Sequence, residues 1–166
     1  MTGPVRAMRK DDVEAATHVF FDAVHDAENT LYNEIQRAAW APLIPDAQKW
    51  QKRLVDQHGF VIEDDQGLAG FMTMTREGMI DLAFIRPDCQ RKGVGSSLYA
   101  AIEACALEHK IRQLATNASK MARPFFEKHG WHVVDEHVIE RSNITLPNYR
   151  MAKNLTRQTG SQRSMA

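Results

Sequence analysis

The stretch FIRPDCQRKGVGSSLYAAIEACALEHK, residues 84–110, joins an apolar run to a basic turn with two glycines and then to a long amphipathic pattern. Apolar residues recur at intervals of three and four from Val94 to Cys105, which predicts a helix from Val94 to about His109. The run MIDLAFI, residues 79–85, is typical of a strand. The sequence therefore predicts a strand that leads through a glycine turn directly into a helix.

This strand-to-helix junction has the features of an anion site. The start of a helix leaves several N–H groups without intrahelical partners and carries the positive end of the peptide dipoles, so it favours phosphate. Gly93 and Gly95 lack a β-carbon and allow a ligand to approach the main chain closely. Basic and hydroxyl side chains flank them: Arg91, Lys92, Ser96 and Ser97. The pattern predicts a cradle for a pyrophosphate group; the alternative is an ordinary glycine-containing helix entry with solvated basic residues.

Two common nucleotide motifs do not fit the junction. A P-loop places its lysine after the second glycine, whereas Lys92 precedes both glycines here. A dinucleotide fingerprint requires a third glycine three positions after the second, and Leu98 stands there. The predicted ligand is therefore neither ATP held by a P-loop nor NAD held by a Rossmann turn.

The rest of the chain predicts a mixed α/β protein. We expect strands at 4–8, GFVIEDD (59–65), GLAGFMTMTR (67–76), GMIDLAFI (78–85), QLATNA (113–118), WHVVDEHVI (131–139) and ITLPNYRMAK (144–153), and helices after Asp12, at about 46–57, at 94–109 and within 120–130. The three strands from 59 to 85 predict an antiparallel meander. The order of elements favours one twisted sheet with helices on both faces.

Composition limits the classes of partner. The chain has 166 residues, 21 basic and 21 acidic side chains, and a pI of about 7.1, so no overall charge attracts it to nucleic acid or a membrane. Two cysteines in a chain of this size suit a reducing compartment. The N-terminus lacks a signal-peptide pattern and no apolar run is long enough to span a bilayer. We expect a cytoplasmic protein with one domain at residues 1–155 and a disordered tail at 156–166.

Two segments resemble the GCN5-related N-acetyltransferase (GNAT) family. IDLAFIRPDCQRKGVGSSLYAAIEACA, residues 80–106, is similar to the family's central motif, with Gln90, Gly93 and Gly95 at the signature positions, and LATNASKMARPFFEKHGWHVV, residues 114–134, is similar to its second block. The resemblance covers residues 4–155. It implies a twisted sheet of about six to seven strands in which the fourth and fifth are parallel and splayed apart.

The resemblance also implies a function. GNAT proteins transfer an acetyl group from acetyl-CoA to a primary amine, here of a small molecule or a peptide, by direct attack of the amine on the thioester, and often pair as homodimers through their last strands. The alternative is a catalytically weak CoA-binding module that serves as a sensor or interaction domain. Either reading makes acetyl-CoA the expected ligand.

The family pattern assigns the cofactor contacts residue by residue. Main-chain N–H groups from Arg91 to Ser96 would hold the pyrophosphate, and the backbone at the end of the central strand would pair with the pantetheine arm as an added strand does. The expected cofactor-binding residues are Phe84, Ile85, Gln90, Arg91, Lys92, Gly93, Val94, Gly95, Ser96, Ser97, Asn117, Ser119, Phe125 and Phe126.

Asp81 is the candidate general base. Strict alternation along the strand puts Ile80, Leu82 and Phe84 on one face and Asp81 on the other among apolar neighbours, where burial would raise its pKa. GNAT members often carry a catalytic Glu or Asp on this strand. The competing reading is a structural carboxylate that holds a neighbouring loop by hydrogen bonds.

The candidate general acid and substrate contacts are less regular. Phe126 stands where the family commonly has a tyrosine that protonates the leaving thiolate, which favours the non-catalytic alternative. Tyr149, or else Tyr32, is the candidate replacement. The family builds its acceptor pocket from the first helices and the last strands, which assigns Tyr32 and Trp40 as substrate-binding residues. The seven histidines show no spacing typical of a metal site, and we expect no bound metal.

Overall fold

The computed structural model describes residues 2–26 and 31–155. The helices are α1 (Val13–Val24), α2 (Glu34–Trp40), α3 (Ala47–Leu54), α4 (Val94–Glu108) and α5 (Arg123–Lys128), with 3₁₀ turns at Lys10–Asp12 and Pro87–Cys89. The strands are β1 (Arg6–Ala7), β2 (His58–Asp64), β3 (Gly67–Met74), β4 (Met79–Ile85), β5 (Gln113–Ser119), β6 (His132–Arg141) and β7 (Ile144–Asn154).

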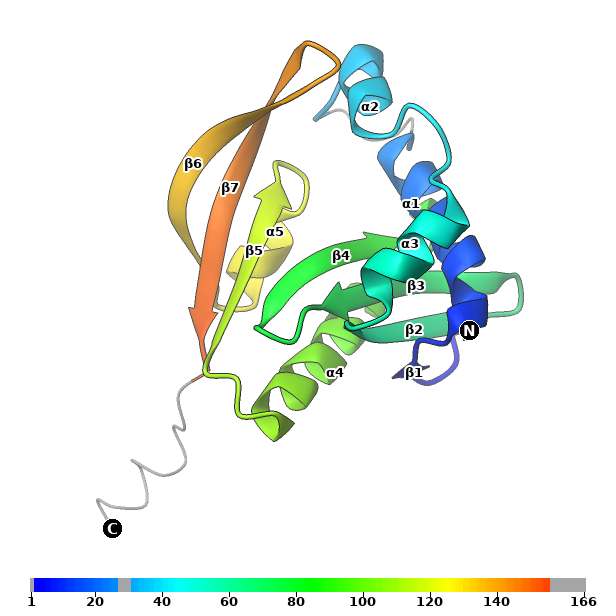
Figure 1. Ribbon diagram of the computed structural model, residues 1–166, viewed down its shortest axis with the longest axis vertical. Helices are drawn as coiled ribbons and strands as arrows, with labels where there is room; N and C mark the ends of the chain where they lie inside the picture. The colour runs from blue at the N-terminus through cyan, green and yellow to red at the C-terminus, as the bar shows by residue number, and fades with distance from the viewer. Residues whose placement is uncertain (1, 27–30, 156–166) are drawn as a thin grey trace.

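The strands form one seven-stranded sheet in the order β1-β2-β3-β4-β5-β7-β6. Strands β2, β3 and β4 make the predicted antiparallel meander, and β5 pairs with β7 along its whole length. The parallel pair β4 and β5 is joined at two positions only, Met79 with Ala115 and Ile80 with Thr116. Beyond them the two strands diverge and divide the sheet into two halves (Figure 1). The splayed parallel pair is thus confirmed.

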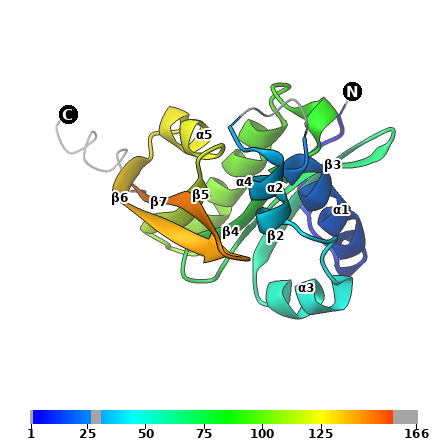
Figure 2. The same cartoon turned by 90° about the horizontal axis from the view of Figure 1, so that it is seen from above.

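Helices cover both faces of the first half-sheet. Helices α1 and α3 lie on one face and α4 on the other, while α5 lies beside β5 on the side of α4 (Figures 1 and 2). One core cluster packs α4 and α5 against the sheet through residues such as Leu98, Ile102 and Phe126. A second cluster packs α1 and α3 on the opposite face, around Phe71 and Trp50. The predicted mixed α/β layering is confirmed.

A β-bulge in β4 corrects the predicted alternation. Thr73 pairs with Leu82 and Met74 with Ile80, so Asp81 is an extra residue opposite the β3 strand. Because a bulge shifts the strand's side chains by one position, Ile80 packs in the cluster on the α4 face and Leu82 in the cluster on the α1 face. The expectation that Ile80 and Leu82 share a face was wrong for this reason.

The segment between α1 and β2 holds one helix that the sequence did not predict. Helix α2 begins with a capping box in which Asn33 and Gln36 bond each other's main-chain N–H groups. Helix α3 begins at Asp46, whose carboxylate accepts from two N–H groups of the first turn. The expected disordered tail, 156–166, lies outside the described residues. Within the described ranges, no helix combines the length and the apolarity that a bilayer crossing requires.

The last paired position of β4 and β5 yields a stability prediction. The buried Thr116 hydroxyl donates to the Ile80 carbonyl oxygen at 2.9 Å, so Thr116→Val should reduce the free energy of unfolding by about 1–2 kcal/mol. Thr73 is equally buried, but its hydroxyl has no hydrogen-bond partner among the described residues. Thr73→Val is therefore the matched control and should be neutral or stabilising in urea denaturation. Equal losses from both variants would contradict the role given to Thr116.

Candidate functional site

The divergence of β4 and β5 opens a cavity of about 530 Å³, a size typical of small-molecule sites. Its walls include Ile80 to Phe84 of β4, Thr116 to Ser119 of β5, and residues of α1, α2, β6 and β7. Past Ile80, β4 pairs only with β3, and past Thr116, β5 pairs only with β7. Each strand therefore turns an edge with unpaired peptide groups toward the opening, which an extended ligand can use.

The glycine turn at the end of β4 exposes a row of N–H groups. None of the main-chain N–H groups of residues 91–96 donates to an acceptor within residues 2–26 and 31–155, and the Ser97 N–H makes the first intrahelical bond, to Gly93. Arg91 and Gly93 adopt left-handed conformations with φ of 61° and 83°. These angles turn the chain sharply before α4. The exposed donors lie at the positive end of a 15-residue helix, which is an anion site.

Helix α5 approaches the main chain of α4 closely at Gly95. A β-carbon at Gly95 would lie 3.1 Å from Cε1 of Phe125, closer than carbon atoms normally pack. Ser96 Oγ is 3.2 Å from Nε2 of His129, just beyond α5. The first turn of α4 is thus packed against α5, which fixes the row of N–H groups relative to β5.

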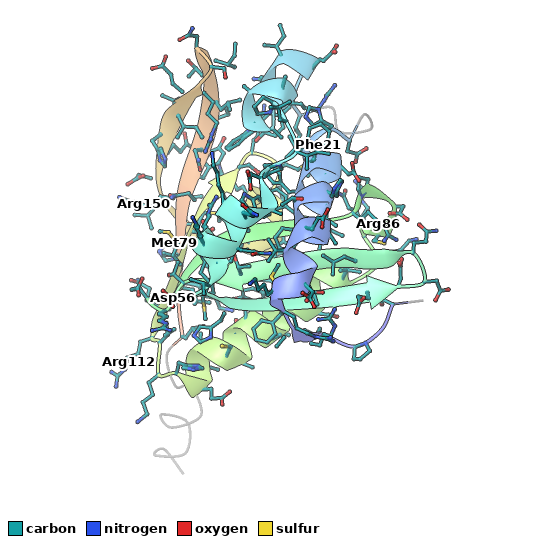
Figure 3. The ribbon with its side chains drawn as sticks, turned by 45° about the vertical axis from the view of Figure 1, so that its right-hand side comes forward. Phe21, Asp56, Met79, Arg86, Arg112 and Arg150 are labelled. Atoms are coloured by element: carbon teal, nitrogen blue, oxygen red, sulfur yellow. The ribbon has the colours of Figure 1, made fainter. Side chains whose placement is uncertain are left out.

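An arginine network holds the other side of this turn. The Arg86 guanidinium, labelled in Figure 3, bonds to Asp64, Asp88 and the Leu68 carbonyl oxygen. The hydrogen bond from Arg86 lowers the pKa of Asp64 to about 2, so the pair stays charged at neutral pH. Arg86 therefore ties the turn between β2 and β3 to the segment that precedes the glycine turn.

Asp81 forms a charged cluster on the cavity wall. Its carboxylate accepts two hydrogen bonds from Arg53 at 2.9 and 2.7 Å and one from Gln57 at 2.9 Å. Burial raises the pKa of Asp81, but the hydrogen bonds from Arg53 and Gln57 outweigh it, and the net direction is downward. The expected rise in pKa was wrong because α3 supplies a guanidinium partner that strand alternation cannot reveal.

Aromatic residues form the wall opposite the two strands. Tyr32 is buried, and its hydroxyl oxygen accepts from the Lys120 N–H at 2.8 Å, which links the segment before α2 to the end of β5. The centroids of the Trp40 and Tyr32 rings are 6.5 Å apart. The Arg141 guanidinium lies over the Trp40 ring, 5.2 Å from its centroid. Tyr32 and Trp40 both line the cavity.

The structure brings some of the expected site residues to the cavity and places others elsewhere. Cavity-lining residues from the expected set are Tyr32, Trp40, Asp81, Phe84, Asn117, Ser119 and Phe126. Residues 90–97 and Phe125 lie around the glycine turn instead. Tyr149 does not line the cavity: its neighbour Asn148 does, and the Tyr149 ring lies on the other face of β7, 4.6 Å from the Arg123 guanidinium.

Sequence reasoning missed several cavity residues, among them two arginines and a buried asparagine. Arg53, Arg141 and Asn148 line the cavity, and Asn148 is buried with its side-chain oxygen accepting from the Tyr149 N–H. Arg53 is 28 residues from Asp81, and Arg141 lies at the tip of the β6–β7 hairpin. No local pattern marks these positions. Only the pairing of β5 with β7, which puts Asn148 opposite Ser119, could have indicated that Asn148 lies at the site.

Comparisons with known proteins agree with this geometry. The family model described as an acetyltransferase (GNAT) domain matches residues 22–153. The chain is similar to the uncharacterized N-acetyltransferase YafP of Escherichia coli K12. The two are 27% identical over 147 residues, which cover 89% of this chain and 93% of that relative.

Solved structures agree as well. A GCN5-related N-acetyltransferase structure from Rhodopseudomonas palustris superposes with a TM-score of 0.84 at 25% identity, covering 93% of this chain and 98% of that one. The putative acetyltransferase yncA of Salmonella typhimurium, solved with its cofactor acetyl-CoA, has a TM-score of 0.69 at 16% identity, covering 93% and 94%.

The Asp81 cluster predicts a pH-dependent stability difference. Asp81→Asn should lower the free energy of unfolding at pH 7 by about 1 kcal/mol, because Arg53 and Gln57 lose a charged acceptor. Since folding lowers the pKa of Asp81, this contribution is complete above the ordinary value of 3.8 and is lost as the pH falls through the folded value. Urea denaturation from neutral to acidic pH should show the wild type and the variant converging.

Asp56→Asn provides the control for this difference. Asp56, labelled in Figure 3, pairs with Arg76 at 3.4 Å, and both side chains are more than two-thirds exposed. Such a pair contributes little, so the control should change stability by less than about 0.5 kcal/mol at every pH. If the two variants behaved alike, the Asp81 cluster would carry no special stabilisation.

Proposed function

This chain belongs to the GNAT family of acetyltransferases, and on that premise we propose that it transfers the acetyl group of acetyl-CoA to the primary amine of a small molecule or peptide that also carries an anionic group. The amine attacks the thioester directly. The observation that carries the proposal is the cavity at the divergence of β4 and β5, which has aromatic residues in its wall, together with the row of unpaired N–H groups that follows β4 in the chain.

The residues around the glycine turn fit the pyrophosphate of CoA. Six consecutive N–H groups, from Arg91 to Ser96, make no hydrogen bond within the described part of the chain, and a β-carbon at Gly95 would meet the Phe125 ring. These observations support main-chain donors and a close-packed cradle as the holding groups. The free edge of β4 at Phe84 and Ile85 would hold the pantetheine arm. When bound, acetyl-CoA supplies an activated acetyl thioester.

The acceptor side of the cavity supports an amine with a negative group nearby. Arg141 makes no ion pair with any residue in the described ranges, so its charge is available at the cavity wall. Arg53, in contrast, is neutralised by Asp81. A carboxylate or similar anion beside the acceptor amine would pair with Arg141, and an apolar portion would pack on Trp40.

Proton transfer follows from the charges of these groups. A lysine-like ammonium has a pKa near 10.4 and must lose a proton before it attacks. Asp81 is ionised and lines the cavity. Its carboxylate oxygens, although hydrogen-bonded to Arg53 and Gln57, remain acceptors that can position the amine. The lowered pKa of Asp81 makes it a weak base, so the proton of the ammonium passes to bulk solvent before the neutral amine attacks the thioester. A thiol with a pKa near 8.5 departs as thiolate without a side-chain acid, and neither Phe126 nor Tyr149, which does not line the cavity, would supply one.

Ligand-dependent melting and thiol release test this proposal together. Acetyl-CoA and CoA should raise the melting temperature, whereas ATP and NAD should not. Free thiol should then appear with amines that carry a carboxylate, and more slowly with the matching carboxamides. Arg141→Gln should remove this preference, and Asp81→Asn should raise the KM for the amine while leaving the acetyl-CoA Kd unchanged.

Phe126 is the residue that supports the alternative function, a CoA-binding module without catalysis. Binding of acetyl-CoA without thiol release from any amine would indicate a CoA-binding sensor or interaction module, since the tyrosine typical of the family is replaced by a buried phenylalanine. Absence of acetyl-CoA binding would contradict both functions.

A pair of substitutions at Ser96 distinguishes the contribution of its main-chain N–H to acetyl-CoA binding from that of its side chain. Proline is tolerated in the first turn of a helix, so Ser96→Pro should remove one main-chain N–H and leave the helix intact. Because a hydrogen bond to a charged group contributes about 1.5–3 kcal/mol, the Kd for acetyl-CoA should rise at least roughly tenfold. Ser96→Ala keeps the N–H and should bind within a few-fold of the wild type. Isothermal titration measures both; a folded Ser96→Pro protein with unchanged affinity would contradict the cradle.

A further inference from the structure

Two histidines and a cysteine meet at the C-terminal end of α4, at the opposite end of this helix from the glycine turn. His58 begins β2, Cys105 lies in the last turn of α4, and His109 follows the helix. One potential ligand atom from each residue lies within 4.8 Å of the other two, and the two imidazole rings are 4.4 Å apart. Within the described ranges, no other three His, Cys, Asp or Glu residues converge in this way.

We propose that His58, Cys105 and His109 form a binding site for Zn²⁺. Two imidazole nitrogens and a thiolate are the ligands that Zn²⁺ prefers, and a fourth tetrahedral position completes the site with water. His109 is exposed, so solvent reaches that position. On binding, the Cys105 sulfur exchanges its proton for the metal and the proton passes to solvent. This site is independent of the proposed acetyl transfer.

The distances are compatible with small side-chain adjustments. Zn–N bonds of about 2.0–2.1 Å and Zn–S bonds of about 2.3 Å place tetrahedral ligand atoms roughly 3.3–3.6 Å apart. Cys105 Sγ and His109 Nδ1 are already 3.7 Å apart, because they lie one helical turn from each other. Nδ1 also bonds the Cys105 carbonyl oxygen at 2.9 Å, a bond that coordination through Nδ1 would replace. The remaining separations, both of which involve His58 and are at most 4.8 Å, close by about 1 Å through rotation of the His58 and His109 rings.

The surrounding charges favour a cation on balance. The carbonyl groups at the end of the 15-residue helix give this end a partial negative charge, and Glu108 adds a carboxylate beside Cys105. Arg76 is the opposing charge near His58; its side chain is more than two-thirds exposed, so solvent screens that charge. An ion bound here joins the first residue of β2 to the end of α4. It would therefore stabilise the contact between the helix and the sheet.

The sequence contained only part of this site. Cys105 and His109 have the four-residue spacing of neighbours on a helix face, but His58 lies 47 residues earlier and is not marked by any pattern. The expectation that no metal binds was based on the local spacing of histidines. The antiparallel meander and the position of α4 over β2 bring the third ligand into place.

Cobalt substitution tests the site directly. Untagged protein, reduced with a phosphine that does not chelate metals, is titrated with Co²⁺, which should produce a thiolate-to-cobalt charge-transfer band and intense d–d bands typical of tetrahedral coordination. One equivalent of Zn²⁺ should abolish these bands and raise the melting temperature. His109→Ala, at an exposed position, should weaken Zn²⁺ binding by more than the roughly 10–100-fold typical of losing an outer-shell partner.

Matched controls keep the result interpretable. Cys105→Ser should remove the charge-transfer band, whereas Cys89→Ser, at the other buried cysteine, should retain it. His132→Ala, at an exposed position on β6, should bind Zn²⁺ like the wild type. The proposal is overturned if wild-type protein shows no cobalt bands with millimolar Co²⁺, or if Cys105→Ser and His109→Ala leave the bands and the melting shift unchanged.

Discussion

The site depends on where the pairing between β4 and β5 ends. Two paired positions and the hydrogen bond from Thr116 to the Ile80 carbonyl hold the strands together at one end. Immediately after them comes the bulge at Asp81, which gives β4 an extra residue and a stronger local twist. The strands then separate, and the sheet contains an opening instead of a continuous core. The cavity is a consequence of that early divergence.

Helix α4 connects the opening to the rest of the molecule. Its buried face, from Val94 to Ala106, packs on the first half-sheet, while its first turn contacts α5 of the second half through Gly95 and Phe125. The row of N–H groups is therefore fixed relative to both halves. Because the helix cannot shift without disturbing the core, a ligand meets donors that are already oriented, and little ordering has to occur on binding.

The electrostatics of the cavity come from pairing across layers. Asp81 of the sheet is matched by Arg53 and Gln57 from the α3 region, and this pairing keeps the carboxylate ionised despite its burial. Arg141, from the distant β6–β7 hairpin, brings a charge that the described residues leave unmatched by an ion pair. The two arginines therefore differ in function: Arg53 sets the state of Asp81, and Arg141 is available to an incoming group.

The sequence by itself determined the order of the strands, the glycine turn and the helix that follows it, because each depends on local periodicity and on residues such as Gly93 that permit unusual backbone angles. It could not determine the bulge at Asp81, since a bulge is a property of two paired strands and becomes visible only in their register. Nor could it join Arg53 to Asp81 or His58 to Cys105 and His109. These contacts link residues 28 to 51 positions apart, and only the packing of helices on the twisted sheet brings their side chains together.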